Sequence, residues 1–435
     1  MPVFRLLARG AAPALSVVLA LGIAGPSLAR SPAAKKGARC TTKHTLKHTG
    51  KKTRKPVKNS RAHAATKHPA CTGVRAPTHR PSPSSSGPSG SSGSSGSSSS
   101  AGAMNIGLVA NTQGWGDHAD QRLATVADRS GVHWLREEFD WDVVQATAGT
   151  FDWSRYDILM TGAAHHGVHI LPVLMAPPSW AASTFSSFPG DPATYATFVS
   201  AVVARYGPDG VFWTTHPSLD ASVAPVWFEL WNEPYYTHTA GGVYDPPGYA
   251  RLVRTAVTAA RLGNPRARFL IGMETTGQQV GSDWVTWTEA LYQADPNFGD
   301  VFDGVAVHPY SEDFTATPPT ASDFDRFNRF DAIHQTLAAH GDGAKPFWIT
   351  EIGYTTCQGT DGCVSESQQA ADLRQAYAQA SQYAYVKAMF IYCFIDDGTG
   401  VPTDGEQWFG LLRRDGTPKP AWDVFQSILA DNPAR

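Results

Sequence analysis

The pattern that decides the fold is clearest at residues 225–234, PVWFELWNEP, and it recurs at residues 346–354, PFWITEIGY. In each stretch an apolar run with little polar alternation leads into a polar end that carries a Glu. Such runs are typical of parallel strands that are covered on both faces. Both stretches are therefore predicted to be buried parallel strands whose carboxyl ends display acidic side chains.

Six further segments of the same kind follow residue 104, and helical segments separate them. The eight predicted strands are Asn105 to Val109, His133 to Arg136, Val168 to Leu174, Pro225 to Leu230, Arg268 to Met273, Gly304 to His308, Pro346 to Thr350 and Ala388 to Phe394. Helix starts are marked by Asp191-Pro192 and by a capping box from Ser365 to Gln368. Eight such pairs predict a closed α/β (β/α)8 TIM barrel over residues 104–435 rather than an open sheet.

The first 103 residues differ sharply in composition from the rest. Of the 36 Lys and Arg, 17 lie in the first 100 residues, whereas all 38 Asp and Glu follow residue 116. Residues 1–29 place two Arg before a short apolar run and a small-residue cleavage site, which predicts a signal peptide, with an uncleaved anchor as the alternative. Residues 30–80 form a basic segment that is expected to be disordered, and residues 81–103 are a Ser/Gly/Pro linker.

This organisation predicts a secreted, extracellular, monomeric protein with no membrane span after signal cleavage. Outside a cell, anionic cell-wall polymers or exopolysaccharide are nearer partners for the basic segment than nucleic acid is, and a solubilising stalk is its other interpretation. Export also fits the cysteines, because Cys357 and Cys363 bracket a short loop that a disulfide would close. A similar pairing is open to Cys40 and Cys71, whereas Cys393 is expected to be a buried free thiol.

Two predicted strands end in residues suited to acid–base chemistry. The active sites of (β/α)8 barrels lie at the carboxyl ends of the strands, so Glu233 and Glu351 are expected on one rim. Glycoside hydrolysis requires two carboxylates across a cleft: one protonates the leaving oxygen, and the other attacks the anomeric carbon or activates water. The alternative is that both are ion-pairing partners on the rim.

The wider context favours the catalytic interpretation. Trp231-Asn232-Glu233-Pro234 at the end of the fourth strand, with Glu351 ending the seventh, resembles the superfamily of retaining (β/α)8 glycosidases that includes the cellulase-like families and glycoside hydrolase family 39. The resemblance extends from Met104 to about Arg435, and includes residues 306–310, AVHPY, and 408–422, WFGLLRRDGTPKPAW. It implies a cofactor-free O-glycosyl hydrolase that acts by double displacement, but it does not imply the sugar.

The resemblance also implies roles for the residues of this chain that match the family's motifs. The resemblance implies that Glu233 is the acid/base, that Glu351 is the nucleophile, and that Asn232 hydrogen-bonds the sugar 2-hydroxyl. It also places Arg136 near the nucleophile, where the positive charge would keep Glu351 ionised.

His308 and Tyr310 match a pair after the sixth strand that contacts the two catalytic carboxyl groups. A structural histidine is the alternative interpretation for His308. A metal-ligand role is disfavoured, because no second ligand stands at metal spacing in the sequence, and no metal is expected.

Aromatic residues near strand ends are candidates for stacking on sugar rings. Members of the superfamily often carry a Trp at the end of the eighth strand, and here that strand is predicted to run into Phe394-Ile395-Asp396. Trp180 and Trp408 are therefore the candidate central platforms, and Tyr235 is a further candidate contact with substrate. Other candidates are Trp115, Trp141, Tyr236, Trp284 and Tyr354.

Several acids near the strand ends are predicted to be solvated rim residues or ligands of sugar hydroxyls: Glu137, Glu138, Asp140, Asp142, Asp396 and Asp397.

The best-supported function is hydrolysis of a poly- or oligosaccharide. Two other functions remain open: a transglycosidase that remodels wall or extracellular glycans, and a carbohydrate-binding pseudoenzyme. The intact Asn232, Glu233 and Glu351 disfavour the pseudoenzyme.

Overall fold

The computed structural model describes residues 104–111, 118–236, 243–310, 327–358, 362–398 and 405–433. The predicted signal peptide, basic segment and linker lie outside these residues, as do Cys40, Cys71 and Trp115.

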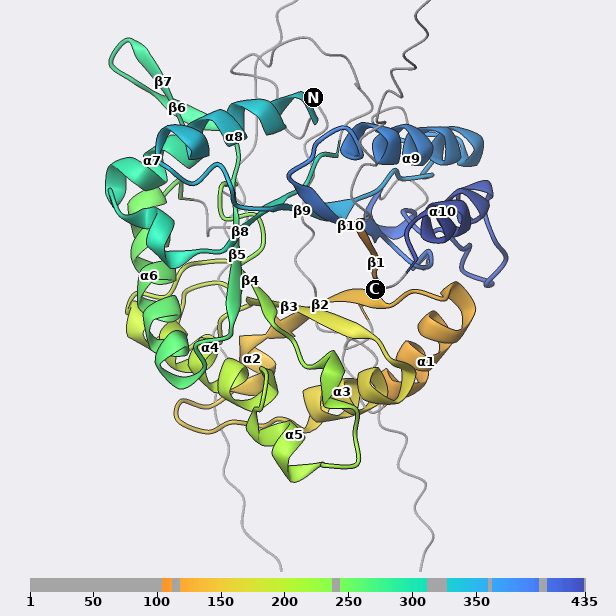
Figure 1. The fold of residues 1–435 in the computed structure, drawn as a ribbon, viewed down its shortest axis with the longest axis horizontal. Helices are drawn as coiled ribbons and strands as arrows, with labels where there is room; N and C mark the ends of the chain where they lie inside the picture. The colour runs from red at the N-terminus through yellow and green to blue at the C-terminus, as the bar shows by residue number, and fades with distance from the viewer. Residues whose placement is uncertain are drawn as a thin grey trace, which may run out of the picture. The chain divides into compact units, whose positions relative to one another are not determined.

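The described part of the chain forms the predicted barrel. Eight parallel strands close in the order β1-β10-β9-β8-β5-β4-β3-β2, as Figure 1 shows. The barrel strands are β1 (Asn105–Val109), β2 (Trp134–Asp140), β3 (His169–Met175), β4 (Trp227–Leu230), β5 (Arg268–Gly272), β8 (Gly304–Val307), β9 (Phe347–Ile352) and β10 (Val386–Tyr392). Each of the eight predicted strands therefore overlaps an observed one.

Helices surround the barrel and cover the outer faces of its strands (Figure 1). The α-helices of the described residues are α1 (Ala119–Ser130), α2 (Trp141–Val144), α3 (Ser154–His166), α4 (Pro192–Tyr206), α5 (Val211–Thr215), α6 (Pro246–Gly263), α7 (Trp287–Ala294), α8 (Phe330–Ala339), α9 (Glu366–Ala380) and α10 (Pro420–Asp431). Short 3-10 turns are η2 (Ala221–Val223), η3 (Phe298–Val301), η4 (Phe327–Arg329) and η5 (Gly405–Gln407). None of the helices within the described ranges is long and apolar enough to cross a membrane.

The helix-start signals hold in the structure. The Asp191 side chain accepts a hydrogen bond from the Ala193 N–H at the start of α4, and Ser365 Oγ accepts from the Gln368 N–H at the start of α9. These contacts satisfy backbone donors that the first turn of a helix leaves unpaired.

One feature of the rim was not predicted. A hairpin of β6 (Gly277–Val280) and β7 (Asp283–Thr286) follows β5 and stands away from the barrel, as Figure 1 shows. Gly281 adopts a left-handed backbone with φ 63° at its turn. The Trp284 side chain on β7 is 41% exposed.

The barrel interior has an aromatic layer with a polar layer above it. The Trp348 ring on β9 contacts Trp134 of β2 and Trp227 of β4, with centroids 5.6 and 5.0 Å apart. Because side chains alternate along a strand, residues two positions later point inward again, nearer the carboxyl ends. In these strands they are Arg136, Glu229 and Thr350, all buried. The sequence thus places a charged layer directly below the mouth of the barrel.

Candidate active site

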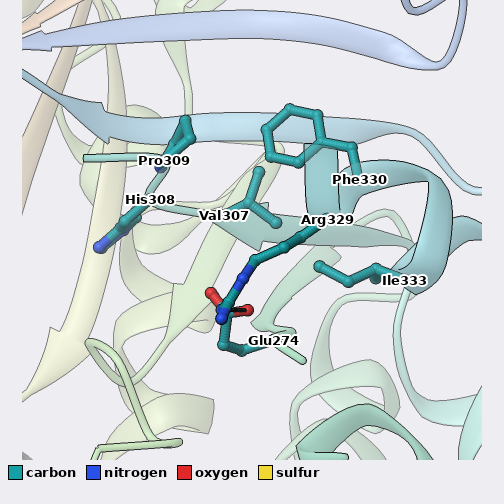
Figure 2. A pocket seen from close by; sticks show the side chains of 7 residues that line it. All are labelled: Glu274, Val307, His308, Pro309, Arg329, Phe330 and Ile333. Carbon is teal, nitrogen blue, oxygen red and sulfur yellow. Dashed lines mark hydrogen bonds and ion pairs between the residues drawn. The ribbon is translucent and has the colours of Figure 1, made fainter. Parts of the chain in front are cut away.

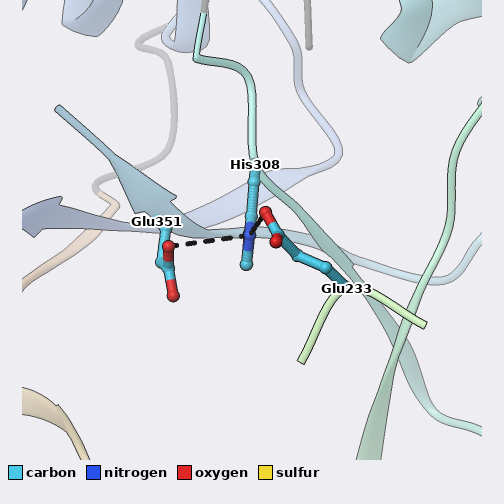
Figure 3. A group of neighbouring side chains, drawn as sticks. All are labelled: Glu233, His308 and Glu351. Carbon is cyan, nitrogen blue, oxygen red and sulfur yellow. Dashed lines mark hydrogen bonds and ion pairs between the residues drawn. The ribbon is translucent and has the colours of Figure 1, made fainter. Parts of the chain in front are cut away.

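The two predicted catalytic carboxylates meet at the carboxyl rim. Glu233 follows β4, and Glu351 lies near the end of β9. Figure 3 shows both side chains directed toward His308, and one oxygen of each Glu lies within 4.8 Å of the other. The two side chains are 13% and 14% exposed, so both remain accessible from solvent.

The turn that presents Glu233 has an unusual backbone. Trp231 and Glu233 both adopt positive φ values, 71° and 45°. Each such non-glycine residue costs on the order of 1 kcal/mol or more, so surrounding contacts must hold the turn in place. The buried Trp231 ring packs against Phe188 and Tyr195 at centroid distances of 5.0 and 5.7 Å. Packing of this ring therefore fixes the direction of the acid two residues later.

Donors hold both oxygens of Glu351. Arg136 Nη1 donates to Oε1, and the Tyr310 hydroxyl donates to Oε2 at 2.8 Å. Hydrogen bonds from a cation and a phenol stabilise the charged carboxylate, which a nucleophile requires. Arg136 Nη2 also donates to Asn232 Oδ1 at 2.8 Å, which leaves the Asn232 amide nitrogen as the donor for a sugar hydroxyl. Arg136 and Tyr310 thus both contact Glu351, and Asn232 joins the same network through Arg136.

His308 lies between the two carboxyl groups and is itself buried. Its Nδ1 is 2.9 Å from Glu233 Oε1 and 3.8 Å from Glu351 Oε2, and its Nε2 is 2.9 Å from Thr350 Oγ1. Burial lowers the pKa of His308, but the neighbouring Glu351, Glu229 and Glu233 outweigh it and raise the pKa to about 10. The imidazole is therefore a cation at neutral pH.

Glu233, His308 and Glu351 are also side-chain types that bind metals. In this structure, however, His308 engages Glu233 and Thr350 through its two ring nitrogens, and Arg136 and Tyr310 engage the two oxygens of Glu351. The cluster is arranged as a hydrogen-bonded acid–base site.

Glu229 is a member of this cluster that the sequence reasoning missed. Its two oxygens accept from Arg136 Nε at 2.8 Å and Nη2 at 3.1 Å, and Thr350 Oγ1 donates to it at 3.2 Å. Burial raises the pKa of Glu229, but Arg136 and His308 overcome this and lower the pKa to about 2. The sequence carried one sign of this role, because Glu229 stands at an inward-facing position of an otherwise apolar strand.

The family comparison covers this site. Residues 232–424, which begin at Asn232 and include Glu233 and Glu351, match the glycosyl hydrolase catalytic core family. The part of the chain from the end of β4 into α10 thus resembles a glycosyl hydrolase catalytic core. Among curated proteins, none matches the sequence.

Solved structures share the fold. A family 39 glycoside hydrolase from the gut symbiont Bacteroides cellulosilyticus WH2 is similar at a TM-score of 0.56 and 20% identity, over 74% of this chain and 63% of that one. A GH39 β-xylosidase from Caulobacter crescentus gives 0.54 and 19%, over 75% and 71%. GH5_18 from Streptomyces cattleya in complex with GlcNAc gives 0.55 and 15%, over 75% and 80%. The chain thus spans under two thirds of the first of these proteins.

The aromatic candidates differ in accessibility. Trp180 is 37% exposed, and its Nε1 donates to the Gln145 carbonyl at 2.9 Å. Trp408 is partly buried in the loop after β10. Tyr235 is only 3% exposed, so its ring belongs to the core rather than to an open surface. Burial likewise places Trp141 and Tyr354 in the core.

The end of the eighth strand of the core lies earlier than predicted. β10 ends at Tyr392 rather than at Phe394, so Tyr392 occupies the rim position. Its side chain is partly exposed and packs edge-on against Phe409 at a centroid distance of 5.2 Å. Burial raises the pKa of Tyr392, and nearby negative groups that include Glu351 raise it further. Tyr392 is therefore an aromatic residue beside the nucleophile that the strand prediction concealed.

Three of the acids predicted to lie on a solvated rim are buried instead. β2 continues to Asp140, so Glu137 and Asp140 are strand residues, 1% and 9% exposed. Asp396 is 4% exposed and accepts hydrogen bonds from Lys419 Nζ at 2.8 Å and the Gly410 N–H at 2.9 Å. The strand extension and the buried lysine explain both corrections.

The loop after Glu351 carries the predicted disulfide. Cys357 and Cys363 are joined, with their Cα atoms 5.1 Å apart, and Cys393 is a free thiol. The bridge closes a short loop beside the rim of the barrel.

A buried ion pair supports the rim on the side of β5. Figure 2 shows Arg329 reaching the carboxylate of Glu274, in a pocket that His308 also lines. The Glu274 carbonyl accepts from Thr288 Oγ1 at 2.9 Å, which fastens the base of the β6–β7 hairpin.

Proposed function

We propose that the chain is a retaining glycoside hydrolase that cleaves O-glycosidic bonds of a poly- or oligosaccharide by double displacement. The observation that carries the proposal is the approach of Glu233 and Glu351 to within 4.8 Å. Retaining enzymes hold their carboxyl groups about 5 to 5.5 Å apart, whereas inverting enzymes keep about 6.5 to 9.5 Å so that a water fits between them. The spacing in this chain supports direct attack.

In the first step, Glu351 attacks the anomeric carbon while Glu233 gives its proton to the departing glycosidic oxygen. The C–O bond to the leaving group breaks as the ester bond to Glu351 forms. Arg136 and Tyr310 hold Glu351 in position for this attack.

In the second step, the ionised Glu233 takes a proton from water, and the water oxygen attacks the anomeric carbon. The ester bond to Glu351 breaks, and the sugar leaves with its original anomeric configuration. The donor nitrogen of Asn232 is placed to hydrogen-bond a sugar hydroxyl throughout.

Aromatic residues on the rim support a sugar chain as the substrate. Tyr392 lies beside the proposed nucleophile. Trp180 on the loop after β3 and Trp284 on β7 of the hairpin after β5 are each more than a third exposed. Aromatic faces stack on the C–H faces of sugars. Rings at the centre and on the flanks of the mouth fit a substrate that extends beyond one sugar unit.

We further propose that the enzyme is secreted, on the strength of the signal-like residues 1–29, and that residues 30–80 hold it near anionic extracellular polymers. Cell fractionation of the full chain tests secretion. Retention on an anionic polysaccharide at low and high salt tests the electrostatic tether, because 0.1 M salt screens exposed charges beyond about 10 Å.

A panel of aryl glycosides and of plant, microbial-wall and extracellular polysaccharides tests the activity, with chromatographic sizing of products. Glu351→Ala should abolish turnover of every substrate. Glu233→Ala should retain the first step only on substrates with good leaving groups, and azide should rescue the second step. Failure of the wild-type enzyme on every glycan would contradict the proposal. Products that join to an added acceptor sugar would identify a transglycosidase.

A further inference from the structure

We propose that Glu229 is a positioning residue that keeps Glu233 supplied with its proton, because its buried negative charge balances two buried cations. The inference rests on the proposed function and assigns a role to a residue that does not touch the substrate.

Glu229 lies between both cations of the cluster. It accepts two hydrogen bonds from Arg136, and its Oε1 is 3.8 Å from His308 Nε2. Arg136 and His308 in turn contact the two catalytic groups, Glu351 and Glu233 respectively. With only 1% of its surface exposed, Glu229 exerts its charge with little solvent screening.

Glu229 also decides which nitrogen of His308 keeps its hydrogen when the imidazolium loses a proton. Thr350 has a single hydroxyl hydrogen, which it donates to Glu229 Oε1. The Thr350 oxygen must then accept from His308, so the His308 Nε2 carries a hydrogen. Nδ1 consequently faces Glu233, and the proton needed for catalysis resides on this histidine–glutamate pair.

The charge of the cluster decides how many protons that pair keeps. With Glu229 and Glu351 ionised and Arg136 charged, the cluster is neutral only when His308 is an imidazolium and Glu233 is a neutral acid. Removing the charge of Glu229 leaves this state with an uncompensated buried cation, which is relieved when the pair releases a proton. Glu233, the proposed general acid, would then lose its proton at a lower pH.

The other charged or titratable groups around His308 and Glu233 are the same in the wild-type protein and in Glu229→Gln. These groups are Arg136 and Glu138 of β2, Tyr310 after β8, Glu351 of β9, Tyr392 of β10, and Glu406 of η5. None of them changes in the substitution Glu229→Gln, so the difference between the two proteins isolates the charge of Glu229.

Glu229→Gln is the principal test, with kcat/KM followed against pH. The alkaline limb, which reports loss of the acid's proton, should move about one unit to lower pH. At pH values on the alkaline side of the limb, glycosides with poor leaving groups should lose activity about tenfold more than aryl glycosides with good leaving groups, because only the former need the acid. An unchanged limb with equal losses on both substrates would overturn the inference.

Two variants separate charge from shape. Glu229→Asp keeps the charge and shortens the side chain, so kcat should fall while the alkaline limb stays in place. Glu274→Gln removes a different buried carboxylate of the rim, which pairs with Arg329, and should leave the limb in place as well. Should Glu229→Gln fail to fold, Thr350→Val, which cuts only the hydroxyl link, should move the limb in the same direction but by less. No shift in Thr350→Val would contradict the link.

A second readout needs no substrate. In protein labelled with 15N-histidine, and with the resonance assigned by a His308→Asn variant, His308 should lose its proton at a lower pH in Glu229→Gln than in wild type. Titration at the same pH in both would overturn the inference even for an enzyme whose substrate is unknown. The absence of all glycosidase activity, by contrast, would count against the proposed function alone.

Discussion

Replacing Arg136 by Met should destabilise the domain strongly at neutral pH. Arg136 is 1% exposed, and together with His308 it outweighs burial and lowers the pKa of Glu229 from 4.5 to about 2. A shift of about 2.5 units corresponds to about 3 kcal/mol, and breaking a buried ion pair costs about 3–5 kcal/mol by direct measurement in other proteins. Both routes predict a loss of about 3–5 kcal/mol in the free energy of unfolding.

The loss should depend on pH in a defined direction. In the wild-type protein the lowered pKa of Glu229 contributes stability that is fully present above pH 4.5 and is lost as pH falls toward 2. Without Arg136, burial raises the pKa of Glu229 instead, so the variant becomes less stable as pH rises through that raised value. The difference between wild type and variant should therefore be largest at pH 7 and smaller at pH 4.

Urea unfolding followed by tryptophan fluorescence at the two pH values measures this difference. The double variant Arg136→Met with Glu229→Leu is the matched control, because it removes both charges and should recover most of the loss. A difference below about 1 kcal/mol at pH 7, or one that widens at pH 4, would refute the assignment of a buried ion pair.

Three further outcomes are expected. Lys419→Met should lower the free energy of unfolding by about 3–5 kcal/mol, because it leaves the buried Asp396 without its ion-pair partner. Adding Asp396→Asn to that variant should restore part of the lost stability. Calorimetry that finds Lys419→Met as stable as wild type would contradict a buried ion pair. Trp284→Ala should weaken binding of a polysaccharide severalfold and leave KM for aryl glycosides unchanged, since the residue lies on the projecting hairpin; a rise in both would place it in the central site. Cys357→Ser should change global stability little, because a six-residue loop loses little entropy on closure, and a large drop in melting temperature would show that the bridge supports the whole domain.

The sequence predicted the barrel well because its strands are continuous apolar runs with clear ends. β1 was predicted with its observed bounds, Asn105–Val109, and the two Glu residues on strand ends identified the rim. Alternation within a strand was harder to recognise. The acids after Arg136 suggested a surface, whereas β2 continues to Asp140 and buries both Glu137 at an outward-facing position and Asp140 at an inward-facing one.

The polar layer under the active site could not be derived from spacing alone. Glu229 acquires its role only when the closed barrel brings Arg136, His308 and Thr350 to it from three other strands or their ends. Tyr392 was missed for a simpler reason, because the apolar run continues past the point where pairing with the neighbouring strand stops. Local pattern missed the end of β10 by two residues and the end of β2 by four, and at the barrel rim such errors change which side chain is placed at the mouth.

The stereochemistry of the first product tests the central claim most directly. In the proposed mechanism Glu351 attacks the sugar itself, because its distance from Glu233 is typical of retaining enzymes and shorter than inverting enzymes need to hold a water. Proton NMR of the wild-type reaction, recorded before the free sugar equilibrates, should show a first product with the same anomeric configuration as the substrate. A first product of opposite configuration would contradict double displacement and remove the nucleophile role from Glu351.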